Sequence, residues 1–190
     1  CALPIYLALL TKVPGMRVLA PSSAQELQQM LHDAVDLADE GPVVIRYPKG
    51  AARQVGEHEV GFGLHARRVR PGKGDLCILA VGKLLAPAER AAEILAVDGI
   101  EATVWDVRSC APLDPDMIAE AAQHQIVITA EDGLRDGGVG MGIADALATH
   151  CAANARRPVV EVLGLPTAFL AQAKPDIILR RLGLDADGIA

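Results

Sequence analysis

The feature that most constrains the fold is the stretch 125–143. An apolar run at 126–130 leads into two acids and a glycine, Glu131-Asp132-Gly133, and an apolar helix-like segment opens at Ile143. A strand that reads as a continuous apolar run is typical of a parallel sheet covered by helices on both faces. The stretch therefore predicts strand, acidic glycine-rich loop and helix, which is the repeating unit of an α/β fold.

The glycines of this loop do not form a nucleotide-binding motif. The spacing around Gly138 and Gly140 gives GxGxxI instead of GxGxxG, and no Lys-Ser/Thr pair follows as in a P-loop. Glu131 and Asp132 would also repel a diphosphate. We therefore expect close packing of the helix against its neighbours, in this chain or another subunit. For the two acids we expect a structural role, accepting backbone N–H bonds, over an acid–base pair.

Similar patterns run through most of the chain and predict alternating strands and helices. Strands are predicted at 16–20, 43–47, 76–81, 102–107, 126–130 and 158–163, and helices at 24–39, 86–97, 114–122, 143–151, 175–182 and from 185 onward. The glycine-rich, mixed-charge segment 51–74 interrupts this order and is predicted to connect two domains. The predicted fold is a three-layer αβα domain with a parallel-rich sheet, preceded by an incomplete α/β domain.

Composition excludes several classes of protein. The chain has 190 residues, is 51% hydrophobic and carries a formal net charge of -6, which argues against a nucleic-acid-binding surface. The four cysteines have neither CxxC spacing nor a neighbouring cluster of histidines, so we expect reduced thiols, no metal site and a cytoplasmic location. No apolar run reaches the roughly 18 residues that a membrane span requires.

Arg46 is the main candidate for binding. It lies at the carboxyl end of a predicted strand, where open α/β sheets place their ligands, and Lys49 follows it. A guanidinium suits phosphate, but a surface ion pair with Asp39 or Glu40 explains the residue equally well. The five histidines have no acid or thiol at catalytic spacing, and we assign no catalytic, cofactor-binding or metal-binding residue.

The decapeptide Gly41-Pro42-Val43-Val44-Ile45-Arg46-Tyr47-Pro48-Lys49-Gly50 resembles the GPxxxRYPRG segment of the 1-deoxy-D-xylulose-5-phosphate synthases, thiamine-diphosphate enzymes of the transketolase superfamily. The resemblance spans about residues 8–190. It continues in Glu131-Asp132-Gly133, in Gly164-Leu165-Pro166 and in 182–189. The sequence departs from the family at Lys49, usually an arginine, and at 171–175, which usually contain His-Gly.

The resemblance implies a domain organisation and a reaction. Residues 1–50 would end a pyrimidine-binding domain, 51–74 would link the domains, and 75–190 would form a transketolase-type C-terminal domain. The family joins pyruvate and glyceraldehyde 3-phosphate, with release of CO₂, to supply isoprenoid, thiamine and pyridoxal precursors. Arg46 would bind the acceptor phosphate. Thiamine diphosphate and Mg²⁺ would be bound by the complete enzyme, a homodimer, but not by this fragment, which we expect to be inactive alone.

Two alternatives remain open at this stage. The chain could come from another enzyme of the superfamily, such as a transketolase or a 2-oxo acid dehydrogenase β-chain, or it could be a stand-alone dimerisation or interaction module. Separately, Cys1-Ala2-Leu3-Pro4-Ile5 is what one frame of a common sequencing adapter encodes. We therefore expect the first five or six residues not to be native and the native chain to continue upstream. The competing interpretation is an apolar strand or helix without its partner.

Overall fold

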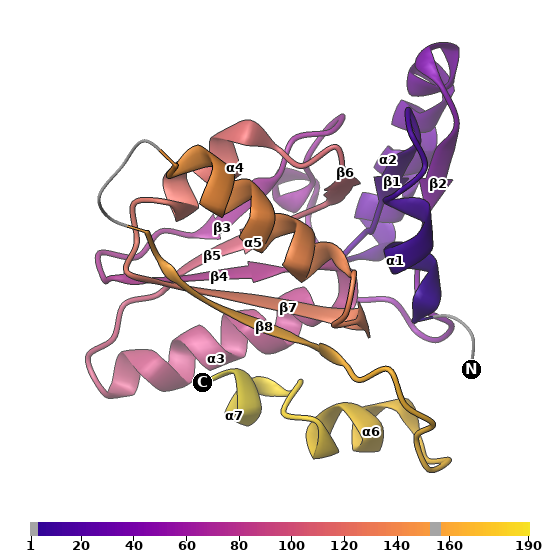
Figure 1. Ribbon diagram of the computed structural model, residues 1–190. Helices are drawn as coiled ribbons and strands as arrows, with labels where there is room; N and C mark the ends of the chain where they lie inside the picture. Colours follow the sequence, from indigo (N-terminus) through magenta and orange to yellow (C-terminus); the bar gives the residue numbers. More distant parts are fainter. Residues whose placement is uncertain (1–3, 153–156) are drawn as a thin grey trace.

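A computed structural model describes residues 4–152 and 157–190, which form two sheets with covering helices (Figure 1). The strands are β1 (Arg17–Leu19), β2 (Val43–Ile45), β3 (Arg67–Arg70), β4 (Leu76–Ala80), β5 (Thr103–Asp106), β6 (Ser109–Ala111), β7 (Ile126–Leu134) and β8 (Val159–Leu165). The α-helices are α1 (Ile5–Leu10), α2 (Ala24–Leu37), α3 (Leu85–Val97), α4 (Pro115–Ala121), α5 (Val139–His150), α6 (Pro175–Arg181) and α7 (Ala186–Ile189). Short 3₁₀ turns are η1 (Ala38–Glu40), η2 (Glu57–Glu59) and η3 (Gly82–Leu84).

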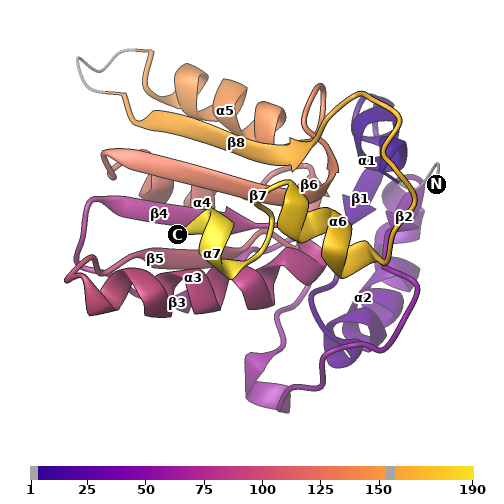
Figure 2. The same ribbon diagram turned by 90° about the horizontal axis from the view of Figure 1, so that it is seen from below.

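The larger sheet has the strand order β3-β5-β4-β7-β8. Its inner strands pair in parallel, and only the edge strand β3 pairs antiparallel, with β5. Helices α4 and α5 cover one face, whereas α3 and α7 cover the other (Figures 1 and 2). The predicted three-layer αβα architecture is therefore confirmed.

Strand β4 explains why the core strands read as unbroken apolar runs. Successive side chains of a strand point to opposite faces of the sheet. Cys77 and Leu79 pack into the cluster under α4 and α5, while Ile78 and Ala80 pack into the cluster under α3. Both faces are thus buried, so neither set of positions tolerates polar residues.

The smaller sheet, β2-β1-β6, combines strands from both halves of the chain. Strand β1 pairs in parallel with β2 and antiparallel with β6, which comes from the C-terminal half. The helix α2 lies beside these strands, and its first turn is capped by the Ser23 hydroxyl, which accepts from the Glu26 backbone N–H at 3.0 Å. This incomplete α/β unit is therefore physically continuous with the C-terminal domain.

A buried ion pair lies at the junction of the two units. Glu26 in α2 and Arg108, between β5 and β6, both have fully buried side chains, and Arg108 Nε donates to Glu26 Oε2 at 2.7 Å. Arg108 Nη1 donates to carbonyl oxygens of the 62–65 segment. The second oxygen of Glu26 accepts from the Gly61 backbone N–H at 2.7 Å. The ion pair and its hydrogen bonds therefore connect both units with residues 61–65 of the predicted linker.

Several local predictions differ from the structure. Strand β7 does not stop before the acids but continues through them to Leu134, because β8 runs alongside and pairs Leu134 with Leu165 beyond a register shift. Helix α5 begins at Val139, four residues earlier than predicted. Strands β3 and β6 were not predicted. The division into 1–50, 51–74 and 75–190 stays a prediction.

The segment expected to be non-native lies partly outside the described residues, which exclude 1–3. From Pro4 onward it leads into α1, whose Leu7 is buried in the core, and the Pro4 carbonyl oxygen accepts from the Leu134 N–H at 3.1 Å. Across the described ranges, every helix is too short or too polar to cross a membrane.

Two glycines of α5 provide a matched test of the predicted close packing. A Cβ on Gly140 would lie 2.4 Å from Thr129 Oγ1 and 2.8 Å from Val162 Cγ1, whereas a Cβ on Gly142 would meet nothing within 4 Å. We expect Gly140→Ala to destabilise the protein by about 1–3 kcal/mol through overpacking. Gly142→Ala should stabilise it by about 0.5–1 kcal/mol through helix propensity. Urea unfolding of both variants checks this, and equal effects would refute the packing account.

Candidate functional site

Three charged residues meet at the carboxyl ends of strands from both sheets. Arg46 directly follows β2, and its backbone N–H donates to the Leu19 carbonyl oxygen of β1 at 2.8 Å. Lys83 lies in η3, just after β4, and Asp132 lies in the last part of β7. Carboxyl ends of adjacent strands are where open α/β sheets bind ligands. We call Arg46, Lys83 and Asp132 the carboxyl-end cluster.

Arg46 and Asp132 form a two-pronged ion pair. Nη1 lies 2.5 Å from Oδ1 and Nη2 lies 3.0 Å from Oδ2, in the fork geometry that makes arginine–carboxylate pairs strong. The side chains are only 10% and 8% exposed. Arg46 therefore does not form the surface ion pair with Asp39 or Glu40 that was the alternative expectation. Its guanidinium is buried against Asp132, and Glu40 forms an ion pair with Arg17.

Lys83 was missed by the sequence analysis. Its Nζ lies 3.8 Å from Asp132 Oδ2, so one carboxylate lies between two cations. The signal available in the sequence was position alone: Gly82-Lys83 directly follows a predicted strand, as Arg46 does. Lys49, the other predicted basic neighbour, is exposed and is not part of the cluster's ion pairs.

Glu131 points to the other side of β7 from Asp132, as alternation along a strand requires. Its Oε1 accepts from the Gly140 backbone N–H at 2.9 Å. A Cβ on Gly138 would lie 2.4 Å from the same oxygen, and one on Gly133 would lie 2.6 Å from Oε2. The glycines therefore make room for this carboxyl group. The predicted acceptance of a backbone N–H bond is confirmed for Glu131, whereas Asp132 accepts from the Arg46 side chain instead.

Burial raises the pKa of Glu131 to about 7. The backbone N–H groups of Gly140 and Val139 oppose this increase, the negative charge of Asp132 adds to it, and Arg46 opposes it. The carboxyl group is therefore divided between its neutral and charged forms near neutral pH. Burial also raises the pKa of the Cys110 thiol next to this cluster and keeps it protonated.

The described residues do not fit a magnesium diphosphate site. Within 4–152 and 157–190, no group of three or more His, Cys, Asp or Glu side chains is placed to hold a metal ion. The two acids at this edge already have partners: Asp132 accepts hydrogen bonds from Arg46, and Glu131 accepts one from the Gly140 backbone N–H. These residues therefore do not supply the ligands of such a site.

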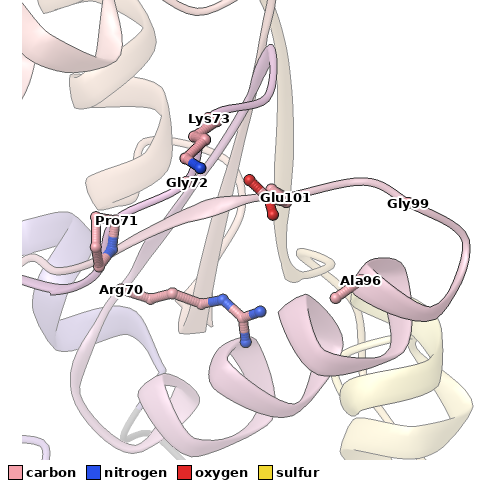
Figure 3. A pocket seen from close by; sticks show the side chains of 7 residues that line it. All are labelled: Arg70, Pro71, Gly72, Lys73, Ala96, Gly99 and Glu101. Carbon is pink, nitrogen blue, oxygen red and sulfur yellow. The ribbon is translucent and has the colours of Figure 1, made fainter.

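A surface pocket lies at the opposite end of the larger sheet (Figure 3). It has a volume of about 400 Å³ and is lined by Arg70, Lys73 and Glu101, next to the amino ends of β4 and β5. Two cations and one carboxylate stand at its rim, the same formal charge balance as in the carboxyl-end cluster. It lies away from the edge where α/β sheets bind ligands.

The pH dependence of stability tests the environment of Glu131. Its pKa is raised from 4.5 to about 7, so the folded state binds more protons than the unfolded state between these values. Its contribution to stability is therefore largest at low pH and is lost as pH rises through this window. Glu131→Gln keeps an acceptor for the Gly140 N–H but does not titrate. We expect the free energy of unfolding of this variant to rise relative to that of the parent as pH increases from about 4.5 to 7. A constant difference across pH would contradict this.

Comparisons with known proteins agree with the fold. The family model described as "Transketolase, C-terminal domain" matches residues 64–189, and that described as "Transketolase, pyrimidine binding domain" matches 5–54. The chain is 42% identical to a 1-deoxy-D-xylulose-5-phosphate synthase from Anaeromyxobacter sp. (strain K), over 97% of this chain and 29% of that protein. It is 38% identical to the synthase of Thermobifida fusca (strain YX), with the same coverage.

The solved structure titled "Split gene transketolase, inactive beta4 tetramer" superposes with a TM-score of 0.81 at 28% identity, covering 98% of this chain and 58% of that one. The present chain spans less than a third of the length of its curated relatives. Both family models match in the order in which the two units occur along the chain. The chain therefore belongs to the transketolase family, with a C-terminal domain and part of a pyrimidine-binding domain.

Proposed function

We propose that this chain is the C-terminal part of a 1-deoxy-D-xylulose-5-phosphate synthase. The complete enzyme would condense pyruvate with glyceraldehyde 3-phosphate and release CO₂, using thiamine diphosphate and Mg²⁺ bound by residues outside this chain. The observation that carries the proposal is the 42% identity with a named synthase over 97% of the chain. The fragment alone would be inactive, and a cytoplasmic homodimer is part of the proposal.

The two alternatives are less well supported. The solved transketolase relative is 28% identical, well below the 42% found with the synthase of Anaeromyxobacter sp. (strain K). A stand-alone interaction module would have no need of a charged cluster at the ligand-binding edge of its sheets. The decapeptide 41–50, with Arg46 in it, also resembles the synthases more than the other members of the superfamily.

Within this function, Arg46 is proposed to bind the phosphate of glyceraldehyde 3-phosphate. A guanidinium has five N–H donors, and Asp132 accepts from two of its nitrogens, so donors remain for a second anion. Arg46 Nε is buried and has no hydrogen-bond partner in the described residues. Asp132 would then hold the guanidinium in place while the phosphate binds its remaining donors.

Steady-state kinetics of the complete enzyme test this role. We expect Arg46→Ala to raise the KM for glyceraldehyde 3-phosphate by at least about tenfold, because a charge-assisted contact worth ~1.5 kcal/mol or more is lost. The KM for pyruvate, which has no phosphate, should change little. Arg46→Lys should fall between, since the charge remains but the fork is lost.

Arg17→Ala is the matched control. It removes the same charge from the opposite end of β1, where Arg17 forms an ion pair with the exposed Glu40. It should leave both KM values unchanged. If Arg46→Ala alters both KM values equally, or alters only thermal stability, then Arg46 is a structural anchor and not a phosphate ligand. Failure of the enzyme to condense the two substrates would refute the proposed function itself.

A further inference from the structure

The carboxyl-end cluster contains more positive charge than its own carboxylate can satisfy. Both oxygens of Asp132 already accept hydrogen bonds from Arg46. Lys83 Nζ, at 3.8 Å from Oδ2, is within ion-pair range but beyond hydrogen-bond distance. No side-chain hydrogen bond of Lys83 occurs within the described ranges. Its three N–H donors therefore remain free for another acceptor.

The fold holds Lys83 in place, although the side chain is long. Gly82 has φ +55, a conformation that favours glycine, and the Val81 N–H donates to the Ala130 carbonyl oxygen of β7 at 2.9 Å. Leu84 and Leu85, which follow, are fully buried in the core. The side chain of Lys83 is only 26% exposed. The ammonium group is thus directed by a rigid turn and not by a mobile surface loop.

The groups around Lys83 leave this positive charge in excess. Asp132 offsets one of the two cations, and Glu131 lies on the other side of β7 with its pKa raised to about 7 by burial. Cys110, also next to the cluster, is kept neutral by burial. Two fixed cations, Arg46 after β2 and Lys83 in η3, therefore face one fixed anion, Asp132. A phosphate dianion is the kind of ligand that such an excess would attract.

We propose that Lys83 is a second phosphate contact, which binds the acceptor's phosphate together with Arg46 while Asp132 fixes the spacing of the two cations. This inference rests on the proposed function and assigns a further specificity-determining residue to it. Arg46 supplies a planar fork and Lys83 a compact charge, so together they can contact different oxygens of one phosphate. Selectivity for a phosphorylated acceptor over an unphosphorylated one would then come from both residues.

The pocket of Figure 3 is the rival site for an anion, and it is less suitable. Lys73 at its rim is exposed, and Glu101 lines the same pocket. Lys73 nevertheless provides a matched control, because it is a lysine of the same domain at the opposite end of the sheet.

The test compares two acceptors in the complete enzyme, glyceraldehyde 3-phosphate and unphosphorylated D-glyceraldehyde. We expect Lys83→Gln to raise the KM for the phosphorylated acceptor about tenfold, as loss of one charge-assisted contact predicts. The KM for D-glyceraldehyde should stay within about twofold, because that acceptor has no phosphate to contact. Lys83→Arg should restore most of the selectivity, and Lys73→Gln should change neither KM.

A double-mutant cycle shows whether Arg46 and Lys83 contact the same phosphate or act independently of each other. If Arg46 and Lys83 contact one phosphate, the effect of Lys83→Gln on KM should be smaller in an Arg46→Ala background than in the parent. Thermal unfolding of each variant verifies folding. Should Lys83→Gln unfold the enzyme, Lys83→Met, which keeps the packed stem of the side chain, takes its place.

The outcomes distinguish this inference from the function on which it rests. If Arg46→Ala is selective for the phosphorylated acceptor but Lys83→Gln affects both acceptors equally, or neither, then the role of Lys83 is wrong and the proposed function stands. If neither variant is selective, the phosphate site is not at this cluster. If the parent enzyme does not use pyruvate and glyceraldehyde 3-phosphate, the proposed function itself is wrong.

Discussion

The buried ion pair between Glu26 and Arg108 is the constraint on which the arrangement of the two units depends. Both side chains are fully buried, so each charge requires the other, and removing one partner of such a pair typically costs about 3–5 kcal/mol. Arg108 also has φ 53, an uncommon backbone conformation for a residue with a side chain. This conformation turns the chain from β5 into β6, and the Arg108 carbonyl oxygen accepts from the Ala20 N–H at 2.8 Å.

This junction has a direct consequence for the candidate site. Because β6 pairs with β1, and β1 with β2, the position of Arg46 is fixed relative to β7. Arg46 can then reach Asp132, 86 residues away in sequence, across the boundary between the two sheets. The charged cluster is therefore a product of how the units are joined and not of either unit alone.

The helices and strands that the sequence predicts are those determined by interactions between residues close together in the chain. Continuous apolar runs predicted β4 and β7. Helices α2 and α4 begin after Ser23 and Asp114, whose side chains accept hydrogen bonds from the first free N–H groups. Strands β3 and β6 were not predicted, because β3 is rich in arginine and β6 has only three residues. Both strands form by pairing with segments that are distant in sequence. Arg46 was found by its place at a strand end. Lys83 and the pairing with Asp132 needed the three-dimensional structure.

Hydrogen exchange in a Glu26→Gln variant tests most directly whether the buried pair fixes the two units. We expect the amides of Ala20 and Arg46, which bond to Arg108 and Leu19, to lose protection. The Val81 amide, bonded within the larger sheet, should keep it. Glu40→Gln, which alters an exposed ion pair, serves as the control and should change none of the three. Unchanged protection of Ala20 and Arg46 in Glu26→Gln would contradict the account.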